Sequence, residues 1–347
     1  MNIGIIGLGV GESHIKGYLS HPSCNIVSLC DSDNNTLDKA KKKYPKYKFT
    51  KDANELLCDP SIDIISIASY DNFHYDQIIK GIENDKHLFV EKPICYFEKE
   101  AKHIYEMLKA KPNLKFSSNL ILRKYERFID LRQKIKSNEL GELSFISGGY
   151  NYGRLKKITE GWRSKMDFYS GVISGGIHII DLMLWLTNDK ITEVFSYGNN
   201  TQSKNSNFKF NDMIAATMKF SSGMIGSLNV NLGCVHPHFH PLEVYGTKAT
   251  FVNDFNYAKF YNARDNKNIN ENRLLNPNIS KYNGLTKLST SYSVLNKGMH
   301  LNDFINSILS GESPSVSSQQ IFDALSICFA IEKSINQSTA VQVNYLN

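Results

Sequence analysis

At 347 residues, the chain is long enough for two domains of ordinary size, each with its own hydrophobic core. A hydrophobic fraction of 41% beside a charged fraction of 21% is typical of a globular protein and excludes a disordered or fibrous chain. The net charge of +6 is modest, and the lysines between residues 39 and 48 have the spacing of a solvated helix face, without the interleaved arginines and aromatics that favour nucleic-acid binding.

The six cysteines are scattered and show neither a CxxC pair nor the spacing of a zinc site, which is typical of reduced thiols inside a cell. The first predicted strand begins so close to residue 1 that no signal peptide fits before it. The most apolar stretch, residues 177–186, is far too short to span a bilayer. We therefore expect a cytoplasmic protein that does not engage a membrane or a nucleic acid.

The first third of the chain alternates short apolar runs with amphipathic stretches, which predicts βαβ units around a parallel sheet. The predicted strands are Ile3–Ile6, Ile26–Cys30, Ile62–Ile67, Leu88–Val90 and Leu114–Ser117. The predicted helices between them cover residues 12–20, 35–44, 73–83 and 97–110.

From about Leu122 the rhythm changes, and the patterns predict strands of antiparallel character with helices on either side. A helix at Tyr125–Lys136, a strand at Leu143–Gly149 and a helix at 177–186 come first, followed by strands at 191–198, 212–220, 224–232 and 242–252. Turn residues stand at Ser221–Gly223 and Tyr245–Thr247, and an Asn-rich stretch at 264–280 predicts an exposed loop. Helices at 298–309 and 317–336 and a strand at Val341–Val343 close the chain.

These patterns predict an α/β protein with two domains. Residues 1–121 form a Rossmann-type, doubly wound parallel sheet, and residues 122–347 form an α+β domain with an open, largely antiparallel sheet that binds substrate and carries oligomer contacts. The last helices are free to pack back onto the first domain. An open sheet leaves a large face that needs covering, so we expect a homodimer or homotetramer.

A glycine-rich run follows the first strand at the point where a helix should begin. Glycines here let the backbone turn tightly and approach a pyrophosphate, whose charge the helix N-terminus stabilises. Asp31 ends the second strand about twenty residues later, where a carboxylate can grip a ribose diol. The predicted dinucleotide contacts from these segments are Gly7, Leu8, Gly9, Val10, Gly11 and Asp31.

Two details of the run refine this prediction. Asp31 favours NAD because a carboxylate would repel the 2′-phosphate of NADP, although Lys39 keeps NADP open. The spacing is Gly-x-Gly-x-Gly, and Glu12 takes the usual place of a third glycine. A carboxylate there is unfavourable near phosphates unless it points away or caps the helix.

The segment His87–Pro93 contains Glu-Lys-Pro after a predicted strand, and Ile67–His74 is a strand followed by a loop that ends in histidine. Trp162-Arg163 precedes a glycine-rich run, and Gly176–Asp181 reads Gly-x-His-x-x-Asp. With Asp303-Phe304 and Gly311–Pro314 near the end, these motifs resemble, in this order, the glucose–fructose oxidoreductase / inositol dehydrogenase / rhizopine-catabolism family, written Gfo/Idh/MocA. The resemblance covers nearly the whole chain.

The resemblance implies that Lys92 lies beside the nicotinamide and hydrogen-bonds the reacting oxygen, and it suggests a cis peptide before Pro93. It implies that His178 is the general base, which takes the hydroxyl proton as hydride leaves carbon for the cofactor. Without the surrounding motifs, a surface lysine and a core histidine would be the ordinary interpretations. Further cofactor contacts implied by the family's loops come from Ser69, Asn72, His74, Glu91 and Lys92.

One residue departs from the family pattern. Many members carry an aspartate four residues before the catalytic histidine, and here Ser174 takes that place. Serine can share a hydrogen bond but cannot hold a negative charge. Either His178 works alone, a different group completes the relay, or the activity is reduced.

Substrate contacts are predicted from position and charge. Lys92 and Asp181, one helical turn after His178, are candidates, although a structural role for Asp181 is nearly as good an interpretation. Arg163 belongs to a basic cluster with Arg154, Lys156, Lys157 and Lys165 that could hold an acidic group, or could simply be solvated. Arg123 and Tyr152, with Tyr150, are placed at the pocket by position alone.

His236, His238 and His240 recur at every second residue and would share one face of an extended segment. Interspersed prolines and the lack of an acidic or cysteine partner favour a pocket rim or interface, so we predict no metal site. The sequence as a whole predicts an NAD(P)-dependent oxidoreductase acting on a sugar-like or polyol hydroxyl or ketone. The alternative is a non-catalytic regulator that senses a dinucleotide or sugar on the same fold.

Overall fold

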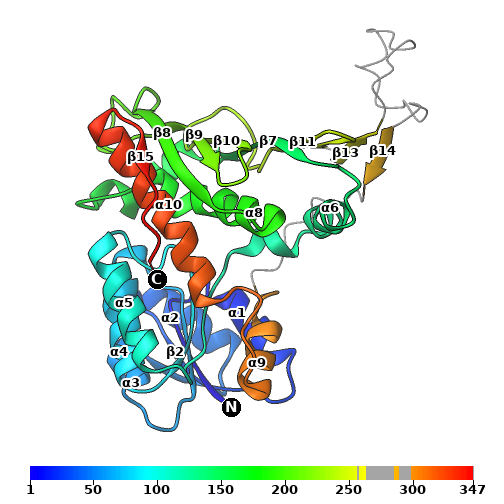
Figure 1. Cartoon of the computed structure of the whole chain (residues 1–347). Coiled ribbons are helices and arrows are strands. Elements are labelled where there is room, and N and C mark those ends of the chain that lie inside the picture. The colour runs from blue at the N-terminus through cyan, green and yellow to red at the C-terminus, as the bar shows by residue number, and fades with distance from the viewer. Residues whose placement is uncertain (256–257, 263–284, 289–297, 347) are drawn as a thin grey trace.

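The computed structural model describes residues 1–255, 258–262, 285–288 and 298–346, with the backbone alone described for 285–288. Its elements form two sheets, seen as the lower and upper halves of Figure 1. None of the described helices is both long and apolar enough to cross a membrane. The Asn-rich stretch predicted as a loop at 264–280 lies outside the described residues.

The first sheet is parallel throughout and has the strand order β3-β2-β1-β4-β5-β6. Its strands are β1 (Asn2–Ile6), β2 (Asn25–Cys30), β3 (Lys48–Thr50), β4 (Ile64–Ile67), β5 (His87–Val90) and β6 (Phe116–Ser118). The connecting helices are α1 (Glu12–Leu19), α2 (Asn34–Lys43), α3 (Ala53–Leu57), α4 (His74–Glu83) and α5 (Glu98–Ala110). All four residues of β4 are buried because helices cover both faces of a parallel sheet.

The strands and helices predicted for this half are confirmed, and two short elements were not predicted. β3 has three residues at the edge of the sheet, and α3 has five. Neither is long enough to show a period of apolar residues, which is why the sequence pattern did not indicate them.

Among the described residues, the second sheet has nine strands in the order β14-β13-β12-β11-β7-β10-β9-β8-β15. They are β7 (Leu143–Asn151), β8 (Ile191–Asn199), β9 (Met213–Phe220), β10 (Ile225–Asn231), β11 (Leu242–Gly246), β12 (Thr250–Asn253), β13 (Ala258–Tyr261), β14 (Leu285–Leu288) and β15 (Val341–Gln342). Burial alternates along β9, as expected for a sheet with one covered face.

One expectation for this sheet needs correction. The single strand predicted at 242–252 is the antiparallel pair β11 and β12, because the turn at Tyr245–Thr247 breaks the run into a hairpin. Within a mostly antiparallel sheet, β7 and β10 pair in parallel. The connection between them therefore includes α8 (Ile177–Thr187), β8 and β9 instead of a tight turn.

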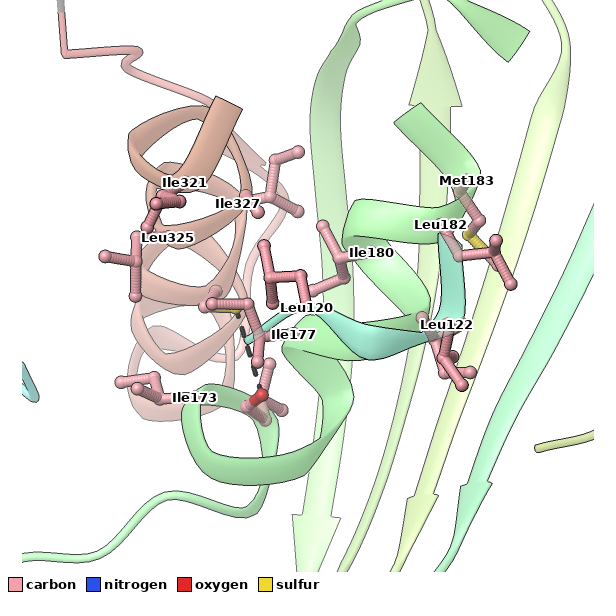
Figure 2. Close-up of a cluster of buried hydrophobic side chains, with 14 of the residues drawn as sticks. Leu120, Leu122, Ile173, Ile177, Ile180, Leu182, Met183, Ile321, Leu325 and Ile327 are labelled. Carbon is pink, nitrogen blue, oxygen red and sulfur yellow. Dashed lines mark hydrogen bonds between the residues drawn. The ribbon is translucent and has the colours of Figure 1, made fainter. Parts of the chain in front are cut away.

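Helices of the second half join the sheets. α6 (Glu126–Lys136), α7 (Leu155–Thr159), α8, α9 (Leu301–Ser310) and α10 (Ser318–Gln337) complete the set of α-helices among the described residues. α9 packs against α1, and α10 runs between the two sheets, contacting α5 and β6 below and α8 and β8 above (Figure 1). Figure 2 shows that apolar side chains lie on both sides of α10: Ile327 is on the side that faces Ile177 and Ile180 of α8, and Ile321 and Leu325 are on the other side.

Candidate active site

The turn between β1 and α1 presents backbone to the cleft. Gly7 has φ of +86°, a region that favours glycine, and a Cβ on it would collide with the carbonyl of Ala68. A Cβ on Gly11 would collide with the Gly7 carbonyl. Around Gly9 the opposite holds, because a Cβ there would meet nothing within 4 Å. The turn is therefore closed on its protein side and open where a ligand can approach the N-terminus of α1.

Asp31 and Glu12 flank this turn and differ in what they face. Asp31 Oδ2 accepts a hydrogen bond of 2.7 Å from the Leu8 amide, so the carboxylate is held beside the turn at the end of β2. Glu12 is the first residue of α1 and forms an ion pair with Lys43 of α2. The hydrogen bond from Lys43 lowers the pKa of Glu12. The carboxylate that the spacing placed near the phosphates is thus directed toward α2 and neutralised there.

The Glu-Lys-Pro segment leaves the end of β5. Glu91 is buried and accepts hydrogen bonds from Asn119 at 2.7 Å and, with the ring nitrogen protonated, from His14 at 3.1 Å. The peptide between Lys92 and Pro93 is cis, as the resemblance suggested. Lys92 Nζ donates a hydrogen bond of 2.7 Å to the carbonyl of Ser174. The lysine of the first sheet therefore reaches the helical segment that carries His178.

The loop after β4 is tied to this segment. His74 is fully buried, with Nδ1 2.7 Å from the Pro93 carbonyl and Nε2 3.1 Å from the Ser69 carbonyl. Ser69 Oγ donates to Gln77, and Asn72 is exposed at the rim of a cavity. His74 holds the two loops together, and direct contacts of these residues with a dinucleotide remain predictions.

His178 lies one turn into a helical segment that begins irregularly. Residues Val172–Gly176 form a π-helical turn that runs into α8. A Cβ on Gly175 would collide with the ring of Tyr150, so the glycine-rich run lets β7 pack closely against this turn. The His178 ring is stacked on Tyr150 at 6.3 Å and meets His240 edge-on at 6.2 Å, measured between ring centroids. His178 itself is 7% exposed.

The histidine run from 236 to 240 contributes two of its three rings to this cluster. His238 and His240 both pack on Tyr150, and Tyr152 stacks on the same ring at 5.9 Å. His236 instead packs against Phe239 and Phe255, because the segment is irregular apart from one bridge at Phe239. Burial, together with His238 and Lys92, lowers the pKa of His240 well below its usual range. No group of three potential ligands among the described residues is arranged to hold a metal.

Arg123 and Asp181 pair with each other. Arg123 binds both carboxylate oxygens of Asp181, at 2.8 and 2.5 Å, with both side chains buried. Burial raises the pKa of Asp181, while Arg123 opposes that rise. Arg123 also donates to Ser315 and Gln320 at the start of α10. These hydrogen bonds join η2 (Ile121–Lys124), α8 and α10, and they support a structural role for Arg123 and Asp181. Contact of either residue with substrate stays a prediction.

Arg163 lies on aromatic rings, one of which, Trp162, lines a cavity. Its guanidinium is 4.4 Å from the Trp162 ring and 6.0 Å from that of Tyr169, and Trp162 stacks on Tyr70 across the cleft at 4.9 Å. The cavity has a volume of about 560 Å³. Its polar and aromatic lining includes Tyr70, Asp71, Asn72, Tyr96, Trp162 and Lys165.

Sequence reasoning did not single out Asp71, Tyr96 or Tyr169. The Tyr96 hydroxyl lies 2.7 Å from Ser174 Oγ and donates to Asp71 at 2.9 Å. Burial raises the pKa of Tyr169 to about 12. Tyrosines 96 and 169 come from segments without a helical or strand period, so no local pattern indicated them.

Comparison with known families agrees with this geometry. Residues 1–119 match the model of an oxidoreductase family with an NAD-binding Rossmann fold, and residues 128–252 match the Gfo/Idh/MocA C-terminal domain. The chain belongs to the Gfo/Idh/MocA oxidoreductase family. The recognition made from the motifs is thereby confirmed, as are the fold class and the assignment to the NAD-binding oxidoreductases.

Relatives in this family align over most of the chain. The myo-inositol 2-dehydrogenase of Thermotoga maritima is 24% identical over 99% of this chain and 98% of its own length. The scyllo-inositol 2-dehydrogenase (NAD(+)) of Bacillus subtilis is 26% identical over 71% of each chain. In structure, the myo-inositol 2-dehydrogenase of Lactobacillus plantarum superposes with a TM-score of 0.82 at 21% identity, covering 99% of both chains. A levoglucosan dehydrogenase in complex with NADH and L-sorbose gives 0.83 at 18% identity, covering 100% and 99%.

The residues of this Gfo/Idh/MocA chain fit an NAD molecule. The open space at Gly9 lies at the N-terminus of α1, where backbone N–H groups and the helix dipole favour a pyrophosphate. Asp31 stands at the end of the neighbouring strand, where the ribose of a dinucleotide is bound in Rossmann folds. Glu12, paired with Lys43, adds no unbalanced negative charge at this place.

Proposed function

We propose that the chain oxidises a secondary hydroxyl of a cyclic polyol or sugar, or reduces the matching ketone, with Lys92 and His178 as catalytic residues. One observation carries the proposal: the Lys92 ammonium, from the end of β5, is bonded to Ser174, one helical turn before His178. This contact supports the proposal because it joins the lysine of one family motif to the helical segment that carries the histidine of the other. The inositol and levoglucosan dehydrogenases among the relatives support a cyclic, hydroxyl-rich substrate.

The chemistry divides between the two side chains. NAD, when bound, supplies the carbon that accepts the hydride. The Lys92 ammonium has three donors, so it can keep its bond to Ser174 and also hold the substrate oxygen, stabilising charge that grows there. The His178 imidazole accepts the hydroxyl proton as the carbonyl forms. Tyr150 stacks on His178 and fixes the plane of its ring.

The contacts around the site support an enzyme more than a regulator. A sensor needs the dinucleotide turn but has no use for a lysine and a histidine brought to one point. In the same proposal, residues 1–121 bind NAD and residues 122–347 bind substrate, with Tyr152 and Arg163 at the pocket wall. The open nine-stranded sheet would be covered in a homodimer or homotetramer, to be tested by light scattering, and the reduced thiols suit the cytoplasm.

The direct test is turnover with a small panel. Purified protein is incubated with NAD and, separately, with myo-inositol, scyllo-inositol and levoglucosan, and NADH formation is followed by absorbance. We expect one of these compounds or a close relative to be oxidised, and His178→Asn to lower kcat about 100-fold or more. His103→Asn, at an exposed position on α5, is the matched control and leaves kcat unchanged. Tight NADH binding without oxidation of any polyol or reduction of any keto-sugar would favour the regulator.

A further inference from the structure

A short chain of hydroxyls joins Ser174 to a carboxylate on the other side of the cleft. The Tyr96 hydroxyl donates a hydrogen bond of 2.9 Å to Asp71 Oδ2 and lies 2.7 Å from Ser174 Oγ. An ionised carboxylate can only accept, so the Tyr96 proton points to Asp71 and Ser174 donates to the phenol oxygen. The direction of both bonds is therefore determined by the carboxylate at the end.

The chain is enclosed at Ser174 and reaches the cavity at Asp71. Ser174 is 5% exposed and Tyr96 is 6% exposed, and the rings of Phe168 and Tyr169 pack against Tyr96. Burial, and after it the charge of Asp71, raises the pKa of Tyr96 well above its usual range, so the phenol keeps its proton at neutral pH. Asp71 begins η1 (Asp71–Phe73) and lines the cavity between the sheets.

The same serine is bonded to Lys92. Its carbonyl accepts the bond from the Lys92 ammonium, and its amide donates to the Ser170 carbonyl at 3.0 Å within the π-helical turn. Ser174 is thus held through its side chain by Tyr96 and in turn holds the lysine through its backbone. Ser174 stands where many family members carry an aspartate. In this chain a carboxylate is linked to that position through Tyr96, and it belongs to Asp71.

We propose that Tyr96 and Asp71 are positioning residues for Lys92: they fix Ser174, whose carbonyl orients the ammonium, and they supply the negative charge that position 174 lacks. This inference rests on the proposed function. The other charged or titratable groups around Tyr96 are Glu100, which accepts from the Tyr96 amide at the start of α5, and Tyr169 with Arg163. Glu100 accepts only from the backbone amides of Tyr96 and Phe97, whereas Tyr169 also shares a side-chain hydrogen bond with Ser174 and lies near the charge of Asp71, so Tyr169 flanks the chain that Tyr96 forms.

Two conservative variants break the chain at different points. Tyr96→Phe removes the hydroxyl and keeps the ring, and Asp71→Asn removes the charge and keeps an acceptor. With the polyol identified above and saturating NAD, we expect each variant to lower kcat about 10- to 100-fold, because small misplacement of a reacting group has costs of this size. KM for NAD and the melting temperature should remain close to those of the unchanged protein.

Matched controls lie on the same cavity wall. Tyr75→Phe removes a hydroxyl that bonds His103, and Asp76→Asn removes a neighbouring carboxylate. Both should keep kcat within twofold. The decisive variant is Ser174→Asp in the Tyr96→Phe background, which places a carboxylate directly where Asp71 acts through Tyr96. If the charge and the bond matter, this change restores most of the lost kcat. If Tyr96 merely fills space, Tyr96→Phe loses no kcat, and a loss that Ser174→Asp does not restore would also overturn the inference.

A second measurement does not depend on turnover. The rate at which acetic anhydride labels the Lys92 amine is read by peptide mass spectrometry, with the half-buried Lys80 of α4 as internal reference. We expect labelling of Lys92 to rise several-fold in Tyr96→Phe and in Asp71→Asn and to fall again with Ser174→Asp. Unchanged labelling and unchanged kcat would overturn the inference. A protein that oxidises no polyol but shows the labelling pattern would overturn the proposed function and leave the positioning role supported.

Discussion

The two sheets contribute different kinds of groups to the candidate active site. The six-stranded sheet offers mostly backbone: the turn at Gly7–Gly11 is shaped by what cannot fit there, and Asp31 is its main side chain. The nine-stranded sheet and its helices offer buried side chains, with His178, Tyr150 and His240 packed ring against ring. The first half therefore shapes the cofactor turn with main-chain geometry and adds Lys92 at the end of β5, and the second half contributes side chains removed from water.

This difference predicts different costs of substitution. A change in the glycine turn alters the path of the backbone and should affect folding and cofactor binding together. A change among the buried polar groups removes a chemical function that the fold does not need, and such groups often reduce stability. Substitutions on the two sides can therefore be distinguished by comparing melting temperature, NADH affinity and kcat.

The largest effect is expected at Lys92. Lys92→Met keeps the length and apolar stem of the side chain and removes the ammonium. We expect kcat to fall about 1,000-fold, since positioned proton-transfer and electrostatic groups contribute on this scale. NADH affinity, measured by fluorescence titration, should change by no more than a few-fold. Lys80→Met, at a half-buried position on α4, is the control. A kcat within tenfold of the unchanged enzyme would refute the assigned role.

Substitutions in the glycine turn should instead lower stability or NADH affinity. Gly7→Ala puts a Cβ against the Ala68 carbonyl at a positive φ, and we expect a loss of about 3 kcal/mol in the free energy of unfolding. Gly9→Ala is the matched variant, because its Cβ meets no protein atom within 4 Å. It should leave the melting temperature unchanged and weaken NADH binding at least tenfold. Equal melting temperatures for the two variants would contradict the conclusion that the turn is packed against protein at Gly7 and open at Gly9.

The same contrast explains what could be predicted from the sequence. In the first sheet the information is local: glycines follow one strand, Asp31 ends the next, and continuous apolar runs mark β4 and β5. The failures there, β3 and α3, are elements of three and five residues. Whether Glu12 would oppose a phosphate depended on Lys43, 31 positions away.

In the second half, His178 was indicated by a motif, but its surroundings were not. The Asp71–Tyr96–Ser174 chain joins three segments separated by 25 and 78 positions, and no periodicity relates them. Asp181 was a candidate for substrate binding or for a structural role because it follows His178 by one turn, and no local pattern indicated that Arg123 binds both of its oxygens. Partners of buried polar groups are chosen by tertiary packing, which a single sequence does not display.

The buried contact between His300 and Leu120 should make the free energy of unfolding depend on pH. His300, before α9, is 1% exposed, and its Nε2 lies 3.1 Å from the Leu120 carbonyl. Burial lowers its pKa to about 4 from an ordinary value of 6.5. The folded state keeps this ring neutral while the unfolded state takes up a proton, so stability is present above pH 6.5 and is lost as pH falls toward 4. Between pH 7 and 5 the loss from this group is about 2 kcal/mol.

Denaturant unfolding at pH 7 and pH 5 tests this contribution of His300 to stability. His300→Asn should reduce the difference in unfolding free energy between pH 7 and 5 by about the same 2 kcal/mol. Exposed His103→Asn should leave the difference as it is. Other histidines, such as the half-buried His87, whose pKa is lowered by burial, contribute equally to all three proteins and cancel in the comparison. An unchanged difference in His300→Asn would show that this ring is solvated in the folded protein.

The smallest effect is expected at Asp31, the side chain of the dinucleotide site that we expect to favour NADH over NADPH. Asp31→Asn keeps an acceptor for the Leu8 amide and removes the charge that repels a 2′-phosphate. We expect the ratio of NADH to NADPH affinity to fall about tenfold, or 1.4 kcal/mol, with little change in the melting temperature. Asp38→Asn, which removes an exposed charge on α2, is the control and should leave the ratio unchanged. If Asp31→Asn also leaves it unchanged, discrimination between the cofactors lies in backbone shape and not in this carboxylate, and the contrast between the two halves of the cleft becomes sharper still.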